Sequence, residues 1–116
     1  MNMKDSEAAL LKGLLEPVIL NYLRGVDMHG YQLISTIRKD FHVYFGASTI
    51  YPALHVLEVK GCIKSTWDLS TDRPRKVYTL TPEGEQLLGF LESCIGQVLH
   101  KFSVGQTEKK PILVRA

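Results

Sequence analysis

Three cationic side chains stand within four positions late in the sequence, at Arg73, Arg75 and Lys76. Pro74 lies between them and fixes its own φ angle, which stiffens the segment. Clustered lysines and arginines suit phosphate groups, because each cation that contacts a phosphate releases a counterion. The cluster therefore predicts contact with the phosphates of a nucleic acid, with scattered solvated charge as the alternative.

Small polar side chains form a second candidate group at Ser48, Thr49, Tyr51 and His55. Hydroxyl groups near a helix N-terminus bind phosphates together with the free backbone N–H groups, and a histidine one turn deeper can reach a base edge. Each residue alone has a plainer explanation, with Ser48 as an N-cap, Tyr51 as a packing residue and His55 as a solvated side chain. Their position just before the cationic segment favours DNA contact.

Patterns for catalysis, metal binding or a bound cofactor are missing from the sequence. Its only cysteines, Cys62 and Cys94, have no histidine or cysteine neighbour at the spacing of a zinc site. We expect both to be buried thiols, and a redox role for Cys94 across a dimer axis is the less favoured alternative. Carboxylates lie mostly at helix ends, and Ser, His and Cys form no triad-like motif. The sequence thus argues against an enzyme.

Bulk properties suit one soluble domain, since the chain has 116 residues of which 45% are hydrophobic and 22% charged. The net charge of +2 does not decide for or against a nucleic acid, because phosphate binding depends on where the charge sits. No apolar run approaches the roughly 20 residues that span a bilayer, and the N-terminal segment lacks the order of a signal peptide. We therefore expect a cytoplasmic protein without a membrane partner.

Helices must position the two candidate groups. Apolar spacing predicts one helix over residues 16–25, with Pro17 in its first turn, where a proline is tolerated. Residues 10–13 before it form an extended arm or a short extra helix. A second helix is expected from residue 29 or 30 to residue 41, with a basic exposed end.

A His-Gly-Tyr run opens the second helix and at first sight suggests chemistry. The favoured interpretation is plainer. We expect His29 to cap the helix, Gly30 to permit close helix packing and Tyr31 to fill space against the third helix.

The third helix is the element that would carry the small polar residues. It is expected to begin near Ser48 as its cap, to hold Pro52 in its first turn and to end at Gly61. Its buried stripe is formed by Ile50, Leu54 and Leu57. The polar candidates then lie on or beside the outer face near its N-terminus.

After the third helix the apolar pattern changes to alternation, which predicts strands over residues 63–68 and 77–80. The polar residues 69–74 join them as a turn, with the cationic cluster on its far side. Thr81 and Pro82 then begin a long last helix. Its apolar stripe needs a partner and consists of Leu87, Leu88, Leu91, Ile95, Val98, Leu99 and Phe102.

Three helices, a hairpin and a further helix predict a mainly α fold with a small β-hairpin (α+β), namely a winged helix-turn-helix with a C-terminal dimerisation helix. We expect the winged domain over residues 10–80, the dimerisation helix over residues 81–102 in the same compact unit, and a flexible tail or small docking arm over residues 103–116. In this fold the third helix enters the major groove and the hairpin tip, or wing, touches the DNA backbone or minor groove.

Four segments, at residues 29–31, 48–58, 61–63 and 73–81, closely resemble the PadR family of transcriptional regulators. The resemblance covers about residues 10–102, and its second and fourth segments are specific in combination. It implies a homodimer joined through the helix after the wing, and usually a repressor. It also implies DNA-reading positions at Ser48, Thr49, Tyr51 and His55 and wing positions at Arg73, Arg75 and Lys76.

Departures from the family pattern, at Val56, Val59, Lys60 and Cys62, prevent the operator sequence from being carried over. The prediction is a sequence-specific repressor that binds a palindromic operator as a homodimer. The alternative is a winged-helix module that uses the same face for a protein partner and binds no DNA.

A small-molecule effector has little room in this short chain, because the C-terminal region resembles that of the compact subfamily. It would have to use the dimer interface or a pocket between the first and last helices. Four aromatic residues could line such a pocket, although aromatics at helical spacing more often belong to the core: Tyr22, Trp67, Phe90 and Phe102.

Overall fold

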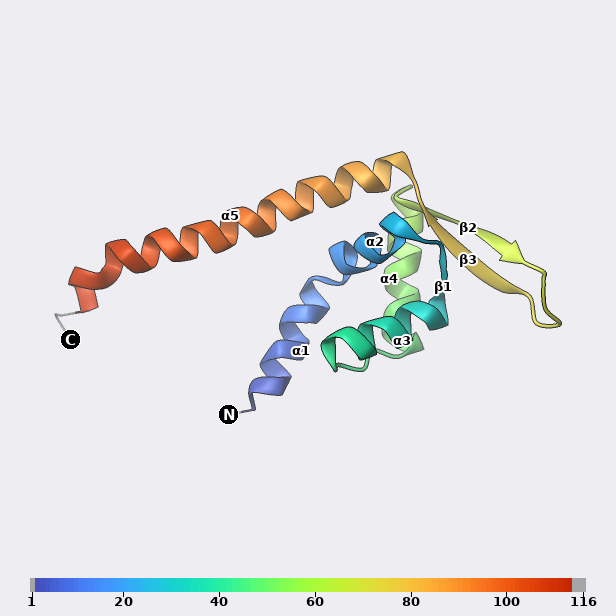
Figure 1. The fold of residues 1–116 in the computed structure, drawn as a ribbon, viewed down its shortest axis with the longest axis horizontal. Helices are drawn as coiled ribbons and strands as arrows, with labels where there is room; N and C mark the ends of the chain where they lie inside the picture. The colour runs from blue at the N-terminus through green and yellow to red at the C-terminus, as the bar shows by residue number, and fades with distance from the viewer. Residues whose placement is uncertain (1, 114–116) are drawn as a thin grey trace.

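The computed structural model describes residues 2–113, with side chains for residues 2–105. Within these residues five helices and three strands follow in the order α1, α2, β1, α3, α4, β2, β3 and α5 (Figure 1). The strands form one antiparallel sheet, and the helices make up most of the chain. The mainly α class with a small β element is confirmed.

The N-terminal segment is an extra helix, one of the two alternatives expected for residues 10–13, but it is longer than predicted, because α1 spans Met3–Gly13. The Asn2 side chain accepts a hydrogen bond from the Lys4 backbone N–H, and Asp5 and Lys12 have the signs that the two ends of the helix dipole favour. Leu11 is its buried residue. The weak apolar stripe of this exposed helix explains why periodicity alone did not reveal its length.

Helix α2 spans Leu15–Gly25 and helix α3 spans Gly30–Phe41, as the apolar spacing predicted to within a residue or so. Pro17 lies in the first turn of α2, where its missing N–H breaks no helical hydrogen bond. His29 is the N-cap residue of α3, and its backbone N–H donates to Gln32 Oε1 over 2.7 Å. The capping part of the His-Gly-Tyr interpretation is confirmed.

Helix α4 spans Ala47–Val59 and begins earlier than the predicted cap at Ser48. Its N-cap is Gly46, whose carbonyl accepts from the N–H groups of Thr49 and Ile50, each over 3.0 Å. Ser48 therefore belongs to the first turn, and Pro52 lies inside the helix, beyond that turn. Pro52 has no N–H, so it cannot donate the helical hydrogen bond that the Ser48 carbonyl would otherwise accept. Because Ser48 is exposed, water can bind this carbonyl instead, and the proline is tolerated inside the helix.

The C-terminus of α4 is closed by a glycine, as predicted. Gly61 has φ +77°, its N–H donates to the Glu58 carbonyl, and the Cys62 N–H donates to the Leu57 carbonyl, each over 3.0 Å. This pair of bonds is the Schellman motif, which needs a left-handed residue after the cap.

Replacing Gly61 by alanine is expected to lower the free energy of unfolding by about 1 kcal/mol, or roughly 4 °C in Tm, because Cβ disfavours positive φ. A new Cβ at this position meets no atom within 4 Å, so backbone strain is the only cost. Gly89 of α5 has equally open surroundings but a helical backbone. Thermal unfolding followed by circular dichroism should therefore show Gly89→Ala stabilising the protein and Gly61→Ala destabilising it; equal shifts would contradict the strain argument.

The sheet has the strand order β1-β3-β2, with β1 at Met28–His29, β2 at Ile63–Asp68 and β3 at Arg75–Leu80. The hairpin of β2 and β3 is the predicted wing, and Figure 1 shows it projecting away from the helices. Strand β1 was not predicted, because two residues are too few to show alternation. It pairs Met28 with Tyr78 and His29 with Val77 and so joins the start of α3 to the wing's base.

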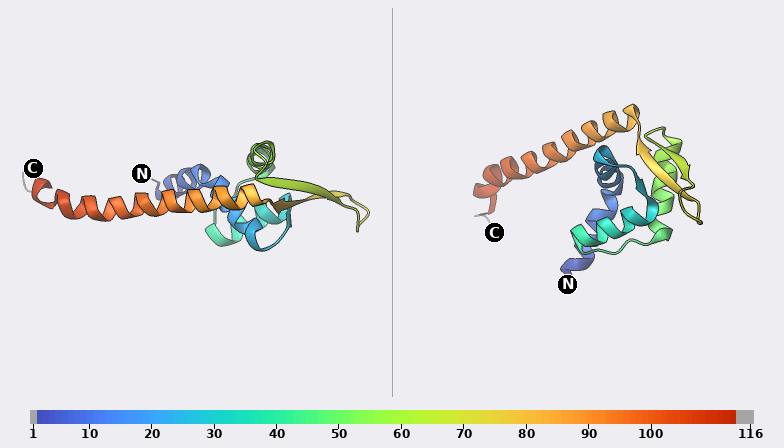
Figure 2. Two further views of the ribbon diagram at one scale, coloured as in Figure 1. Left: turned by 90° about the horizontal axis from the view of Figure 1, so that it is seen from above. Right: turned by 45° about the vertical axis from the view of Figure 1, so that its right-hand side comes forward.

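Helix α5 spans Pro82–Leu113 and runs away from the body of the molecule (Figures 1 and 2). It continues past residue 102, where the sequence predicted its end, so residues 103–113 belong to this helix; residues 114–116 lie outside the described part. Thr81 Oγ1 accepts from the Gly84 N–H over 3.1 Å at its start. Arg24 of α2 holds it along its first half through Glu85 at 3.2 Å and Glu92 at 2.9 Å.

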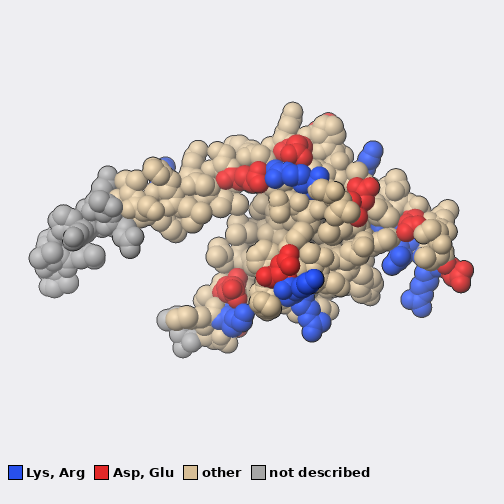
Figure 3. All heavy atoms as spheres, viewed as in Figure 1, with Lys and Arg blue, Asp and Glu red and all other residues tan. Residues whose placement is uncertain are grey.

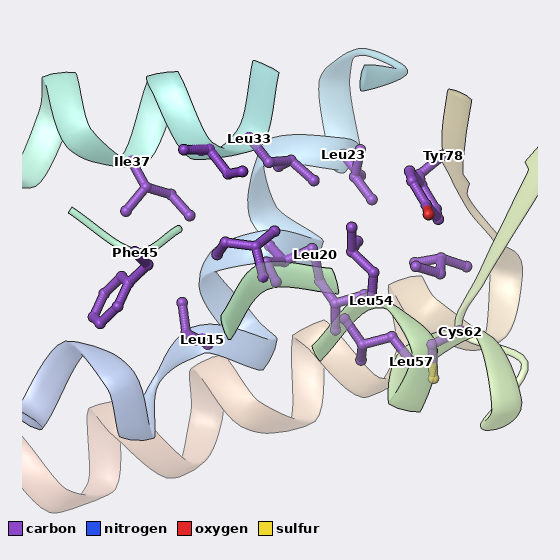
Figure 4. Packing of buried hydrophobic residues seen from close by; sticks show 14 of the residues in the cluster. Leu15, Leu20, Leu23, Leu33, Ile37, Phe45, Leu54, Leu57, Cys62 and Tyr78 are labelled. Carbon is purple, nitrogen blue, oxygen red and sulfur yellow. The ribbon is translucent and has the colours of Figure 1, made fainter. Parts of the chain in front are cut away.

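The core lies where α2, α3, α4 and the sheet meet (Figure 4). Leu88 is fully buried and anchors α5 to this cluster, at about 1.5–3 kcal/mol for a side chain of its size. Cys62 is buried too, which raises the pKa of its thiol, whereas Cys94 is only half-buried; neither forms a disulfide. The fully buried side chains are Ile19, Leu20, Leu33, Ile37, Ile50, Leu54, Leu57, Ile63 and Leu88.

Candidate nucleic-acid interface

Helix α4 turns its buried stripe to the core and leaves a polar face outside, as the sequence predicted. Ser48 and His55 are exposed on this face, with Pro52 between them. Thr49 is half-buried and lies toward α1, where it lines a groove with Lys12. The structure thus brings Ser48 and His55 onto one surface and places Thr49 at its edge.

Tyr51 lies on the other edge of that face and packs against the first residue of α3. A Cβ on Gly30 would overlap the Tyr51 ring, so the glycine permits this close approach, as expected. Burial is the main cause of a raised Tyr51 pKa, with nearby Tyr31 as a second cause. Tyr31 itself is 67% exposed and does not fill space against α4, which corrects that part of the prediction.

The cations of the wing are free to meet a ligand. Arg73, Arg75 and Lys76 are exposed, and no ion pair engages any of them among the residues with described side chains. Lys76 Nζ lies 5.8 Å from the centroid of the Trp67 ring, opposite it on the hairpin. Figure 3 shows cationic side chains gathered along the lower edge of the wing.

A hollow of about 800 Å³ separates the outer wing from the starts of α3 and α4. One wall carries the wing cations, and the other carries Tyr31 and Tyr51. The hollow is open, and the three cations on its wing side suit an extended anionic chain such as a sugar-phosphate backbone. Sequence reasoning found the cations and Tyr51, but the structure is needed to place them across a common space.

The four aromatic residues proposed for an effector pocket do not meet. Tyr22 donates its hydroxyl to Asp40 over 2.6 Å, and burial raises the Tyr22 pKa further than this bond does. Trp67 belongs to the wing, and Phe90 and Phe102 are exposed on α5. Tyr22 does line a groove between α2 and α5, so the predicted lining is correct for this residue. It is wrong for the other three rings, because the sequence pattern did not reveal which face each of them occupies.

The apolar stripe of α5 divides into two parts. Leu88 is only 1% exposed in the single chain and belongs to its own core, so it is removed from the candidate dimer contacts. Leu87, Leu91 and Ile95 are half-buried along a groove beside α2. The outer stripe, which we define as Val98, Leu99 and Phe102, is exposed by 50–70%.

Among the described residues no group of three or more histidine, cysteine or acidic side chains is placed to hold a metal ion. None of the described helices is both long and apolar enough to cross a membrane.

Residues 19–89, more than half of the chain, match the model of the transcriptional regulator PadR-like family. The chain belongs to this family. The resemblance inferred from the short segments is confirmed, and the family is one of regulators, which are generally not enzymes. Among curated proteins, no significant match is found.

Solved structures of the PadR family share the fold. A family regulator from Eggerthella lenta is 29% identical with a TM-score of 0.77, and the alignment covers 93% of this chain and 94% of that one. A PadR-like transcription factor from Bacteroides fragilis is 28% identical with a TM-score of 0.73, over 85% and 96%. Bacillus subtilis PadR, in complex with operator DNA, is 32% identical with a TM-score of 0.60, over 67% of this chain and 46% of that longer one.

Three residues near the interface escaped sequence reasoning or were misplaced by it, namely Tyr31, Trp67 and Asp68. The signal for Tyr31 was its position beside a helix-opening glycine. Trp67 and Asp68 stood at the end of an alternating run, where a strand that leaves the core exposes both faces. The sequence did not predict that the two-residue strand β1 pairs with β3, and this pairing brings the start of α3 to the base of the wing.

Proposed function

We propose that this chain is a sequence-specific DNA-binding transcriptional repressor that acts in the cytoplasm and binds a palindromic operator as a homodimer. The observation that carries the proposal is the hollow between the cations Arg73, Arg75 and Lys76 on one wall and Tyr31 and Tyr51, at the starts of α3 and α4, on the other. The cations of such a surface can contact the phosphates of the DNA backbone while α4 enters a groove.

In the proposed complex α4 enters the major groove. Ser48, Thr49 and Tyr51 near its start contact phosphates and fix the register, while His55, one turn deeper, faces base edges. The wing cations contact the backbone of the adjacent strand. The structure of Bacillus subtilis PadR in complex with operator DNA, a relative of the same fold, supports DNA as the ligand.

The homodimer is proposed from the outer stripe and the grooves beneath α5. Val98, Leu99 and Phe102 present apolar surface that a monomer would leave in water, and an apolar groove between α2 and the half-buried part of α5 continues from it. A two-fold dimer places two copies of α4 about one helical turn of DNA apart, which is why the operator is expected to be palindromic.

The proposal is tested by selecting genomic fragments of the source organism with the purified protein at about 0.1 M salt. We expect enrichment of a few fragments that share a two-fold symmetric sequence lying beside promoters. Binding should weaken steeply as salt rises, because phosphate contacts release counterions. Failure to enrich any sequence would favour the alternative, a winged-helix module that binds a protein partner.

A further inference from the structure

One contact between a histidine ring and a carboxylate joins the outer wing to the start of α3. His29 Nε2 lies 3.0 Å from Asp68 Oδ2, and the two side chains are 15% and 24% exposed. His29 is the N-cap residue of α3 and part of β1, whereas Asp68 is the last residue of β2. The contact therefore links two elements that are 39 residues apart, at the point where the wing leaves the body.

Both partners are held in place by further hydrogen bonds. The backbone N–H and the hydroxyl of Ser70 donate to Asp68 Oδ1, over 3.0 and 2.6 Å. These bonds, followed by the one to His29, lower the pKa of Asp68 to about 2, so the carboxylate is ionised at neutral pH. On the other side, His29 Nδ1 lies 2.8 Å from Gln32 Oε1. Two restrained side chains make a stiffer link than two flexible ones would.

The outer wing has little else to hold it. Strand β1 pairs with β3 only at Val77 and Tyr78, so the outer ladder is a two-stranded ribbon, which is marginal on its own. Arg75 is the cross-strand neighbour of Asp68, yet no ion pair between them is formed in the described structure. Among the described side chains, the His29–Asp68 pair is the one polar contact that ties residues 68–74 to the body.

This pair lies at the border of the hollow that is proposed to face DNA. His29 lines the hollow beside Gly30 and Tyr31, while Asp68 lies in the strand that carries Trp67 on the other wall. We propose that His29 and Asp68 are positioning residues that fix the distance of the wing cations from α4. The inference rests on the proposed DNA binding, since a preset wing spares the complex the entropy of ordering it.

The test uses two aspartates of the same wing. Asp68 and Asp72 carry the same charge, but Asp72 is exposed and has no partner in the described structure. Loss of either charge should by electrostatics alone strengthen binding to DNA. If Asp68 positions the wing, Asp68→Ala should instead weaken binding to the selected fragment about tenfold, while Asp72→Ala binds as tightly as the parent protein or more tightly.

Three further variants separate the pair from its surroundings. His29→Asn keeps a good N-cap but is too short to reach Asp68, and it should weaken binding as Asp68→Ala does. The double variant, Asp68→Ala with His29→Asn, should bind DNA no more weakly than either single variant, because both substitutions remove the same interaction. Ser70→Ala removes a neighbouring bond to Asp68 and should have a much smaller effect.

A readout independent of DNA is the fluorescence of Trp67, the chain's only tryptophan, next to Asp68. Its anisotropy in the free protein, measured well below the unfolding temperature of each variant, should fall in Asp68→Ala and His29→Asn but not in Asp72→Ala. Equal affinities for Asp68→Ala and Asp72→Ala, or an unchanged anisotropy, would overturn the proposal. If the parent protein bound no DNA, the proposed function would fail, and the anisotropies would still decide whether the pair holds the wing.

Discussion

Replacing Arg73, Arg75 and Lys76 together by alanine is expected to lower the affinity for operator DNA on the order of 100-fold at about 0.1 M salt. Three exposed cations at about 1 kcal/mol each give this factor, a value already discounted for solvent. The loss should be similar for selected and unrelated sequences, because phosphates carry no sequence information. None of the described acidic side chains forms an ion pair with these three cations, so their charge is available to phosphates.

A salt titration in a mobility-shift assay separates this loss from unfolding. The slope of log affinity against log salt should become shallower by about 0.9 for each lost phosphate contact. Lys4 in α1 and Lys101 in α5 are cations far from the wing, so replacing both by alanine is the matched control and should change the slope little. An unchanged slope in the wing variant would refute the wing assignment.

Contact with phosphates also depends on where the wing is held, and this could not be predicted from sequence. The cationic cluster and the hairpin were recognised because charge and alternation are local properties of a few residues. The His29–Asp68 pair was not recognised, because it joins residues 39 positions apart through a two-residue strand. Such a contact follows from how α3 and the wing pack, which no local pattern encodes.

The start of α4 shows a second limit of local reasoning. Ser48 is a better N-cap by propensity than Gly46, yet the structure caps the helix with Gly46. Phe45 is buried and Gly46 follows it directly, so the chain enters the helix at this point. Tertiary packing overrode the propensity and moved Ser48 to an exposed place in the first turn. The predicted polar face survived this shift, because its spacing depends on the buried stripe and not on the cap.

Burial likewise decided which residues of α5 remain available to a partner. The spacing of three and four residues correctly predicted a helix over the whole stripe. It does not distinguish residues of the chain's own core from residues of an interface. Leu88 faces the core because burying its side chain is worth about 1.5–3 kcal/mol, whereas the exposed ion pairs of Arg24 with Glu85 and Glu92 add less to the attachment of α5. The outer stripe lies beyond this attachment and has no core residue to cover it.

Val98→Glu combined with Phe102→Glu is therefore expected to convert the proposed homodimer into a monomer. A buried, unpaired carboxylate at an interface costs several kcal/mol, and a dimer would bury four of them. The protomer should keep its fold, because both side chains are at least half exposed in the single chain. Light scattering after gel filtration gives the molar mass, and circular dichroism checks the fold.

Gln97→Glu supplies the control, since it adds the same charge to an exposed position on another side of α5. This variant should remain dimeric and bind the palindromic fragment as the parent protein does. The double variant should bind that fragment with much lower affinity, because each monomer then holds a single half-site without help from its mate. A double variant that stayed dimeric would move the interface away from the outer stripe, and a parent protein that was already monomeric would refute the homodimer itself.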